Sequence, residues 1–314
     1  MNGIINFLKP PGMTSHDVIH FVRRTTGIKK VGHTGTLDPG AAGVLVVCLG
    51  QATRLSQFLV DDTKEYRAEI TFGLTTSTGD SFGLATAQGN AAGLSEKIVR
   101  DSLTAFTGEI NQVPPMTSAI KQQGKRLYQL ARDGIVVDRP ARKVTIYSLE
   151  YIWGTGWGGT RPRALLHLSC SKGTYVRTLC EDLGGYLGCG AHMSFLVRTR
   201  AGIFNISDSA TLEEIKAAAI EGKLMDKVIP MEKALPGLPV VTVKNGAATA
   251  VASGSKLYQP GVYQMPENLS EGDLVQLVGP GGLLAVAETI LDPEYQDRLF
   301  FKPVCVLQVR AGGD

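Results

Sequence analysis

The segment of this 314-residue chain best suited to chemistry is a glycine-rich stretch at 30–45, which carries His33 and Asp38. An aspartate is ionised at neutral pH and can attack or stabilise an electron-poor carbon. This one also lies in a turn sequence, Asp38-Pro39-Gly40, and turn aspartates commonly hydrogen-bond their own backbone. Spacing alone leaves both the catalytic and the backbone-bonding role of Asp38 open, and the second is the commoner for an aspartate in a turn. His33 by itself is an ordinary loop residue. The stretch is no phosphate-binding loop, because it contains neither G-x-x-x-x-G-K-S/T nor G-x-G-x-x-G.

The cysteines and histidines do not indicate a disulfide framework or a metal site. Both would need cysteines at paired spacings, and no C-x-x-C pair occurs. The histidines likewise lack ligand spacing beside a cysteine or carboxylate cluster. We therefore expect chemistry without a bound transition metal. The cysteines are scattered at Cys48, Cys170, Cys180, Cys189 and Cys305.

Positive charge is concentrated in one part of the chain. The formal net charge is +3 and the pI is near 8.5. Residues 1–235 hold 27 basic and 21 acidic side chains, whereas 236–314 hold five basic and eight acidic ones. Seven of the basic residues fall within 121–143, against two acidic ones. Such a segment fits a polyanionic partner, and it fits a solvated surface equally well.

Composition indicates a folded, soluble protein. Hydrophobic residues make up 43% of the chain and charged residues 19%, which excludes a disordered tail. The longest apolar runs, such as 44–49, are far shorter than the roughly 18 residues of a membrane span. Residues 1–9 lack the basic start and apolar core of a signal peptide. We expect a cytoplasmic protein with no membrane contact, and the length favours two domains.

Strand and helix patterns alternate through 1–230 without a strict βαβ rhythm, which favours an α+β fold over a doubly wound parallel sheet. Residues 66–72 alternate apolar and polar side chains, as in a half-buried strand. Helix starts are predicted at 14–17, at Ser95 and at 211–214 from their capping side chains.

Glycine and proline divide the chain further. Residues 73–93 are poor in large apolar side chains and predict a long loop, and 154–159 predict a hairpin connection between strands. Three prolines punctuate 230–239, which is the best domain boundary. The short apolar runs beyond it predict a small, mostly β module at 236–314.

Six motifs, in order along the chain, resemble those of the TruB family, the tRNA uridine-55 pseudouridine synthases. The string GHTGTLDP at 32–39 is similar to the family's catalytic signature, and KPPGMTS at 9–15 to its K-P-x-G-x-T-S motif. The others are KEY at 64–66, followed by TFG at 71–73 and TGD at 78–80; PPMTSAIK at 114–121; GTYVRTL at 173–179; and LVRTRAG at 196–202. Because chance agreement of one motif does not raise the others, the ordered set is specific.

The resemblance implies a pseudouridine synthase fold at 1–235, with a central mixed or antiparallel sheet flanked by helices. It also implies a PUA-like RNA-binding domain at 236–314. The implied activity is isomerisation of uridine 55 in the T loop of tRNA to pseudouridine, without a cofactor. That reaction breaks the bond between ribose C1′ and uracil N1, rotates the base and rejoins it through C5.

By the same resemblance Asp38 is the residue that acts on the nucleotide. It can attack ribose C1′, attack uracil C6 or remove a ribose proton to form a glycal; these routes stay open, and we favour the glycal. Arg177 is implied to pair with Asp38, which would hold the carboxylate ionised and oriented. The alternative is a surface pair between Arg177 and Glu181, four residues apart on one helix.

Four further residues are implied to contact the target nucleotide or its surroundings. Tyr66 matches the tyrosine that stacks on the uracil and is available for a late proton transfer, although its strand face also fits a core role. Tyr175 and Leu196 match residues that line the uracil pocket, with core packing as an alternative for Leu196. The target lies inside a folded stem-loop and must be flipped out, and His33 is implied to fill the gap by stacking.

Contacts to the rest of the tRNA are implied at two insertions and at basic residues. The segments near 73–93 and 121–143 are expected to clamp the T arm. The negative charge of 236–314 argues against strong phosphate contact there, so the PUA-like domain is expected to assist binding. Candidate phosphate-binding residues are Lys9, Lys121, Arg132 and Arg142.

The sequence departs from the family pattern at Gly40, where many members have a larger residue, and at Val46, where many bacterial members have proline. Thr34 and the 71–80 segment are similar to the stand-alone bacterial type, whereas guide-RNA-dependent relatives usually have serine at position 34. We therefore expect a monomer with no obligate protein partner or guide RNA. A tRNA-folding chaperone is the alternative function, and an Asp38→Asn variant would separate it from catalysis.

Overall fold

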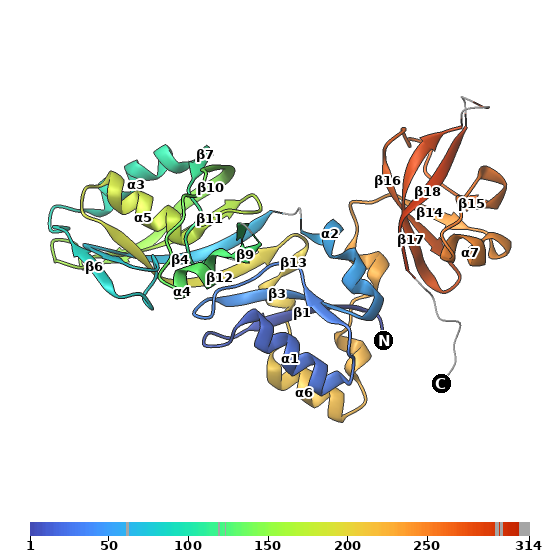
Figure 1. The fold of residues 1–314 in the computed structure, drawn as a ribbon, viewed down its shortest axis with the longest axis horizontal. Helices are drawn as coiled ribbons and strands as arrows, with labels where there is room; N and C mark the ends of the chain where they lie inside the picture. The colour runs from blue at the N-terminus through green and yellow to red at the C-terminus, as the bar shows by residue number, and fades with distance from the viewer. Residues whose placement is uncertain (61–62, 119, 123, 293–294, 296–297, 308–314) are drawn as a thin grey trace.

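In the computed structural model the chain forms two bodies, each built on its own β-sheet, with the C-terminal body standing at one end of the molecule (Figure 1). The structure describes residues 1–60, 63–118, 120–122, 124–292, 295 and 298–307, and only the backbone of 121, 122, 126, 128 and 132. Within these residues no helix is long and apolar enough to cross a membrane.

The larger body contains a nine-stranded mixed sheet. Its strands are β1 (Gly3–Lys9), β2 (Val31–His33), β3 (Ala42–Leu49), β4 (Lys64–Phe72), β7 (Gly108–Gln112), β10 (Arg142–Thr155), β11 (Arg163–Cys170), β12 (Ala191–Ala201) and β13 (Phe204–Asn205). The main path runs β1-β3-β12-β4-β11-β10-β7, with β2 paired to β3 and β13 to β12. Neighbours are antiparallel except β3 and β12, which run parallel. The expected α+β fold with a mixed sheet is confirmed.

The helices of this body lie over different parts of the sheet (Figure 1). They are α1 (Ser15–Thr26), α2 (Ser56–Leu59), α3 (Glu96–Ser102), α4 (Leu127–Arg132), α5 (Val176–Tyr186) and α6 (Leu212–Ile220). Helices α1 and α6 pack on β1 and β3, and α3 and α5 share an apolar core with β4 and β11. The predicted helix starts are confirmed: Thr14 and Thr211 each form a reciprocal capping box, and Ser95 caps α3.

Strand β3 is buried on both faces, which explains the uninterrupted apolar run at 44–49. Leu45, Val47 and Leu49 pack with α1 and α6, whereas Val44 and Val46 face the opposite cluster, which includes side chains of the C-terminal body. Because successive strand residues point to opposite faces, a strand with two buried faces shows no polar alternation. By contrast, β4 alternates as predicted.

The predicted loop at 73–93 contains a short hairpin. Its strands β5 (Leu74–Thr76) and β6 (Ala85–Gln88) pair in antiparallel register. The prediction of a long loop therefore left out these two short strands. The pattern was missed because β6 reads ATAQ and is exposed along its whole length, so no apolar alternation marks it. The predicted hairpin connection at 154–159, by contrast, does join β10 to β11.

The C-terminal body is mostly β, as predicted. Its sheet has the order β15-β14-β16-β17-β18, from β14 (Val240–Val243), β15 (Val262–Gln264), β16 (Leu274–Gly279), β17 (Gly282–Leu291) and β18 (Leu299–Val306). Helix α7 (Asn245–Ala252) packs against this sheet. Leu283, Val286 and Cys305 pack in one apolar cluster with Ile4 and Val44 of the larger body. The two bodies are thus joined by a shared core.

Candidate active site

Asp38 forms a two-point ion pair with Arg177 at the start of α5. Arg177 Nε lies 2.9 Å from Asp38 Oδ2, and Nη2 donates to Oδ1 at 3.3 Å. The Arg177 side chain is 6% exposed and that of Asp38 34% exposed. The expected pairing is present, and within the described residues Arg177 makes no ion pair with Glu181. The guanidinium is buried, while the carboxylate stays partly open to solvent.

The other donors of Arg177 join segments that are distant in sequence. Nη1 donates to the Thr78 carbonyl at 3.0 Å and to the Thr117 hydroxyl, and Nη2 donates to the Thr117 carbonyl at 3.2 Å. Nη1 also lies 3.9 Å from Asp80 Oδ2. A guanidinium with this many charge-assisted contacts has one orientation, and it imposes that orientation on Asp38.

The electrostatics of the pair set the proton affinity of Asp38. Burial raises the pKa of the Asp38 carboxyl above its ordinary value, and neighbouring Asp80 adds to the rise. Arg177 and Lys9 lower this pKa without outweighing burial. The site therefore combines an oriented carboxylate with a greater affinity for a proton than a free aspartate has.

Lys9 lies beneath the Asp38 turn and is fully buried. Its ammonium donates to the carbonyls of Pro10 at 2.9 Å, Pro39 at 3.2 Å and Ala41 at 2.6 Å. Burial lowers the pKa of this ammonium to about 8. The structure contradicts the prediction that Lys9 contacts a phosphate, because its three donors are already used and none of its surface is exposed. It holds the turn that carries Asp38.

Replacing Lys9 with methionine is expected to destabilise the protein by about 2–4 kcal/mol, because buried carbonyls lose their donor while the aliphatic stem is kept. Melting temperature and denaturant midpoint measure the change. Lys97→Met on α3, where the lysine side chain is 84% exposed, is the matched control and should change stability by less than about 0.5 kcal/mol. Unchanged stability with weakened RNA binding would instead restore the phosphate role for Lys9.

Helix α1 also holds the Asp38 turn. Ser15 Oγ accepts from the Leu37 N–H at 2.9 Å and donates to the Leu37 carbonyl at 3.1 Å. The Gly12 N–H donates to the Pro39 carbonyl at 2.8 Å. The capped start of α1 therefore fixes the backbone on both sides of Asp38, and this explains why the 9–15 motif and the 32–39 motif form one structural unit.

Tyr66 lies on β4 opposite Arg198 of β12 and is 7% exposed. Burial raises the pKa of its hydroxyl, which stays protonated at neutral pH, and neighbouring Arg198 lowers this pKa without outweighing burial. Arg198 is itself buried and donates to the carbonyls of Val44 at 2.7 Å and Gly35 at 3.1 Å. One arginine thus connects the tyrosine to the loop that carries Asp38.

The remaining predicted contact residues lie on three elements. His33 ends β2; burial lowers its pKa, and its Nδ1 has no hydrogen-bond partner within the described residues. Tyr175 immediately precedes α5, where Gln112 accepts from its N–H at 3.0 Å and donates to its carbonyl at 3.3 Å. Leu196 is 6% exposed and belongs to the same apolar cluster as Tyr66.

Comparison with known proteins gives the same assignment over almost the whole chain. The N-terminal domain of TruB family pseudouridylate synthases matches residues 23–176, the C-terminal domain of tRNA pseudouridylate synthase B matches 177–236, and the PUA domain matches 239–295. Proteins named tRNA pseudouridine synthase B from Pelotomaculum thermopropionicum and Moorella thermoacetica are 64% and 46% identical, over 99% and 98% of this chain and 99% of each relative. The chain belongs to the TruB family.

Solved structures extend the likeness beyond that family. An H/ACA ribonucleoprotein bound to a substrate RNA containing 2′-deoxyuridine has a chain that matches with a TM-score of 0.73 at 28% identity, over 98% of this chain and 86% of that one. An archaeal box H/ACA complex matches with a TM-score of 0.72 at 29% identity, over 98% and 87%. The predicted pseudouridine synthase fold with a C-terminal PUA domain is confirmed.

The basic segment at 121–143 lies within the TruB N-terminal domain and forms a small hairpin followed by a helix. The hairpin pairs β8 (Lys121–Gln122) with β9 (Lys125–Arg126), which leads into α4. The side chains of Lys121 and Arg132 lie outside the described residues. Arg142 is exposed at the start of β10, where a phosphate could reach it.

Two residues of this TruB site were not singled out from the sequence. Asp80 orders the turn after β5 and approaches Arg177, and Arg198 ties Tyr66 to the Asp38 loop. Both belong to motifs that resemble those of the family, TGD at 78–80 and LVRTRAG at 196–202, and these motifs are the signal that could have identified them. Their contacts with Arg177 and with the Asp38 loop depend on the tertiary structure and could not be predicted from the motifs.

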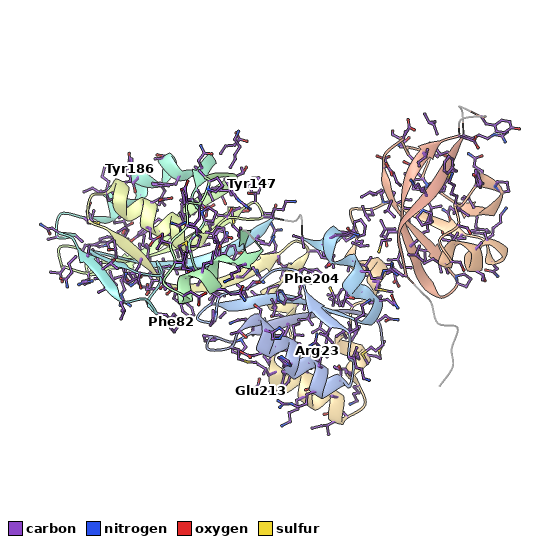
Figure 2. All side chains as sticks on the ribbon, in the orientation of Figure 1. Arg23, Phe82, Tyr147, Tyr186, Phe204 and Glu213 are labelled. Atoms are coloured by element: carbon purple, nitrogen blue, oxygen red, sulfur yellow. The ribbon has the colours of Figure 1, made fainter. Side chains whose placement is uncertain are left out.

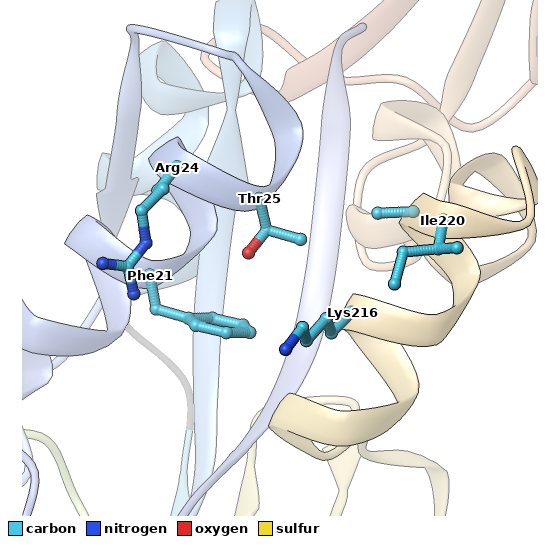
Figure 3. Close-up of a pocket in the computed structure, with 6 residues that line it drawn as sticks. Phe21, Arg24, Thr25, Lys216 and Ile220 are labelled. Atoms are coloured by element: carbon cyan, nitrogen blue, oxygen red, sulfur yellow. The ribbon is translucent and has the colours of Figure 1, made fainter.

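A separate pocket of about 450 Å³ lies between α1 and α6 (Figure 3). None of the predicted TruB site residues lines it. Its lining residues are Phe21, Arg24, Thr25, Lys216, Ala219 and Ile220.

Proposed function

We propose that this protein isomerises uridine 55 in the T loop of tRNA to pseudouridine, with Asp38 as the essential carboxylate and without a cofactor. The observation that carries the proposal is the partly exposed Asp38 carboxylate, held at two points by a buried Arg177. Membership of the TruB family supplies the reaction class. The name shared by its relatives, tRNA pseudouridine synthase B, supports tRNA as the substrate.

The reaction breaks the C1′–N1 bond and forms a C1′–C5 bond, so no electrons are gained or lost overall. Asp38 acts either as a nucleophile at ribose C1′ or uracil C6 or as the base that removes a ribose proton to give a glycal. We favour the glycal, because the raised proton affinity of Asp38 suits a base. Tyr66 is a protonated phenol beside the Asp38 loop. It stacks on the uracil and is available for proton exchange at the late step in which C5 loses its hydrogen.

A uridine paired or stacked inside a tRNA stem-loop cannot reach Asp38 without leaving the stack, because Arg177 and Tyr66 lie inside the protein. Flipping the nucleotide costs a few kcal/mol unless another group fills the gap. His33 fits that task, since burial lowers its pKa and a neutral imidazole can stack on a base. Tyr175 and Leu196 line the uracil pocket.

The pH dependence of the reaction follows from the shifted pKa of Asp38. The carboxylate form is required, so activity is lost as pH falls through a pKa that lies above the ordinary 3.8. We expect the acid limb of kcat/KM to lie above 3.8, with circular dichroism at each pH confirming that the protein stays folded. An acid limb at or below that value would mean that Asp38 is not the group that titrates.

The protein is proposed to act alone on tRNA in the cytoplasm, as a monomer. Contacts with the tRNA outside the active site come from the 73–93 segment and from the 121–143 segment, which includes Arg142. The PUA domain assists this binding. The similar H/ACA structures belong to ribonucleoprotein complexes, so dependence on partners is the competing arrangement. Thr34 and the 71–80 segment favour the stand-alone type.

Turnover by the purified protein alone tests this proposal. When the C1′–C5 bond forms, C5 loses its hydrogen, so a tRNA transcript tritiated at uridine C5 releases tritium to water on isomerisation. We expect multiple turnovers on full-length tRNA and on its isolated T-arm hairpin, with no added protein or RNA. Binding of both RNAs without any tritium release would exclude the stand-alone enzyme.

A further inference from the structure

Phe82 is an aromatic side chain that lies beside the Asp38 loop and is 78% exposed. A Cβ atom at Gly40, two residues after Asp38, would lie 2.0 Å from Phe82 Cε2 and 2.7 Å from Cζ. The edge of the ring therefore occupies the space that any side chain at position 40 would need. Figure 2 shows Phe82 at the lower edge of the left-hand part of the larger body. Glycine at position 40 therefore lets the Phe82 ring lie directly against the Asp38 turn.

The turn that carries Phe82 is well ordered by hydrogen bonds. Asp80 Oδ1 accepts from the Thr78 hydroxyl at 2.6 Å and from the Phe82 N–H at 3.0 Å. The Met193 N–H of β12 donates to the Gly79 carbonyl at 3.0 Å. Because Arg177 also donates to the Thr78 carbonyl, the turn is fixed relative to the Asp38 pair. The backbone that carries Phe82 is thus fixed relative to the active site.

Phe82 contributes little to the folded core, since most of its ring stays in contact with water. An exposed aromatic ring at the rim of an RNA site is suited to stacking on an unpaired base. The turn at 77–84 contains no lysine or arginine, and its one acidic group, Asp80, is occupied within the turn. The turn thus offers RNA no cationic side chain for a phosphate, and its most exposed aromatic surface is the Phe82 ring.

We propose that Phe82 stacks on an unpaired base of the substrate RNA next to the flipped uridine, and so positions the RNA over Asp38. This inference rests on the proposed function and adds a specificity contact to it. Stacking of a base on an aromatic side chain contributes about 1–3 kcal/mol by alanine substitution. At about 1.4 kcal/mol per tenfold change in affinity, the lower part of this range corresponds to a roughly tenfold weaker complex.

The test measures Kd and kcat of Phe82→Ala on the T-arm hairpin. We expect Kd to rise about tenfold and kcat at saturating RNA to stay within about twofold. Phe82→Trp should restore tight binding. The slope of log Kd against log salt should not change, since stacking releases no counterions. Ile220→Ala on α6 is the matched control, because Ile220 is also 78% exposed, is not aromatic and lies outside the segments proposed to contact RNA.

Hairpins with an abasic site at each unpaired position in turn identify the stacked base. One of them should weaken binding to the wild-type protein but not to Phe82→Ala, because the two losses remove the same contact. Equal Kd values for wild type and Phe82→Ala, or an equal loss in Ile220→Ala, would overturn the proposal. Absence of tritium release by the wild-type protein would instead overturn the proposed function, so the two failures are distinguishable.

Discussion

An Asp38→Asn variant is expected to lose at least about 10⁴-fold in the rate of pseudouridine formation. Asparagine keeps the shape of the side chain, and its amide oxygen can still accept the hydrogen bond that Arg177 Nη2 now donates to Asp38 Oδ1 at 3.3 Å. The amide cannot act as a nucleophile at ribose or uracil, and it cannot remove a ribose proton. All three routes open to Asp38 therefore end with this substitution.

The variant should still bind tRNA, with Kd within about twofold of wild type, because phosphate and base contacts made elsewhere supply the affinity. Single-turnover rates and filter-binding isotherms on the same transcript separate the two properties. Asp101→Asn on α3, where the aspartate side chain is 63% exposed, is the matched control and should leave both unchanged. Substantial activity in Asp38→Asn would remove this carboxylate from the mechanism and favour a binding role for the site.

Arg177→Lys is expected to lower kcat by about 10²-fold or more while keeping the positive charge. A lysine ammonium is a point charge and cannot reproduce the two parallel contacts to Asp38 together with those to Thr78 and Thr117. The carboxylate would then lose its fixed orientation. Single-turnover kinetics at saturating tRNA measure the loss.

The pH profile distinguishes an electrostatic role for Arg177 from a merely structural one. Arg177 is the strongest of the groups that lower the pKa of Asp38, so weakening the pair should move the acid limb to higher pH. Arg100→Lys on α3, an exposed arginine paired with Glu96, is the matched control and should change neither kcat nor the limb. If kcat falls but the acid limb stays at the same pH, Arg177 has only a structural role in the site.

Local sequence rules predicted the elements that carry the site. Reciprocal capping at Thr14 and Thr211 located two helices, and apolar alternation located β4 with Tyr66 on its buried face. These succeed because a cap or an alternating strand is decided by a few neighbouring residues. The hairpin at β5 and β6 was missed because β6 is exposed along its whole length and β5 is only three residues long, so no apolar alternation marks either strand.

Contacts between distant segments could not be obtained from local rules. Asp38 and Arg177 are 139 residues apart in the sequence. Their ion pair was predicted only from the resemblance to a known family, because no local pattern connects the two positions. A lysine between a strand and two prolines is expected on the surface, yet Lys9 is buried because Pro10, Pro39 and Ala41 present three carbonyls to it. Such burial depends on the tertiary arrangement.

Position-resolved mapping of pseudouridine tests the central claim most directly. An unmodified tRNA transcript is incubated with the purified protein or with its Asp38→Asn variant, and every uridine is then scored. We predict one new pseudouridine, at position 55 of the T loop, with the wild-type protein and none with the variant. Pseudouridine confined to other positions, or formed at position 55 by Asp38→Asn, would contradict an Asp38-dependent uridine-55 synthase.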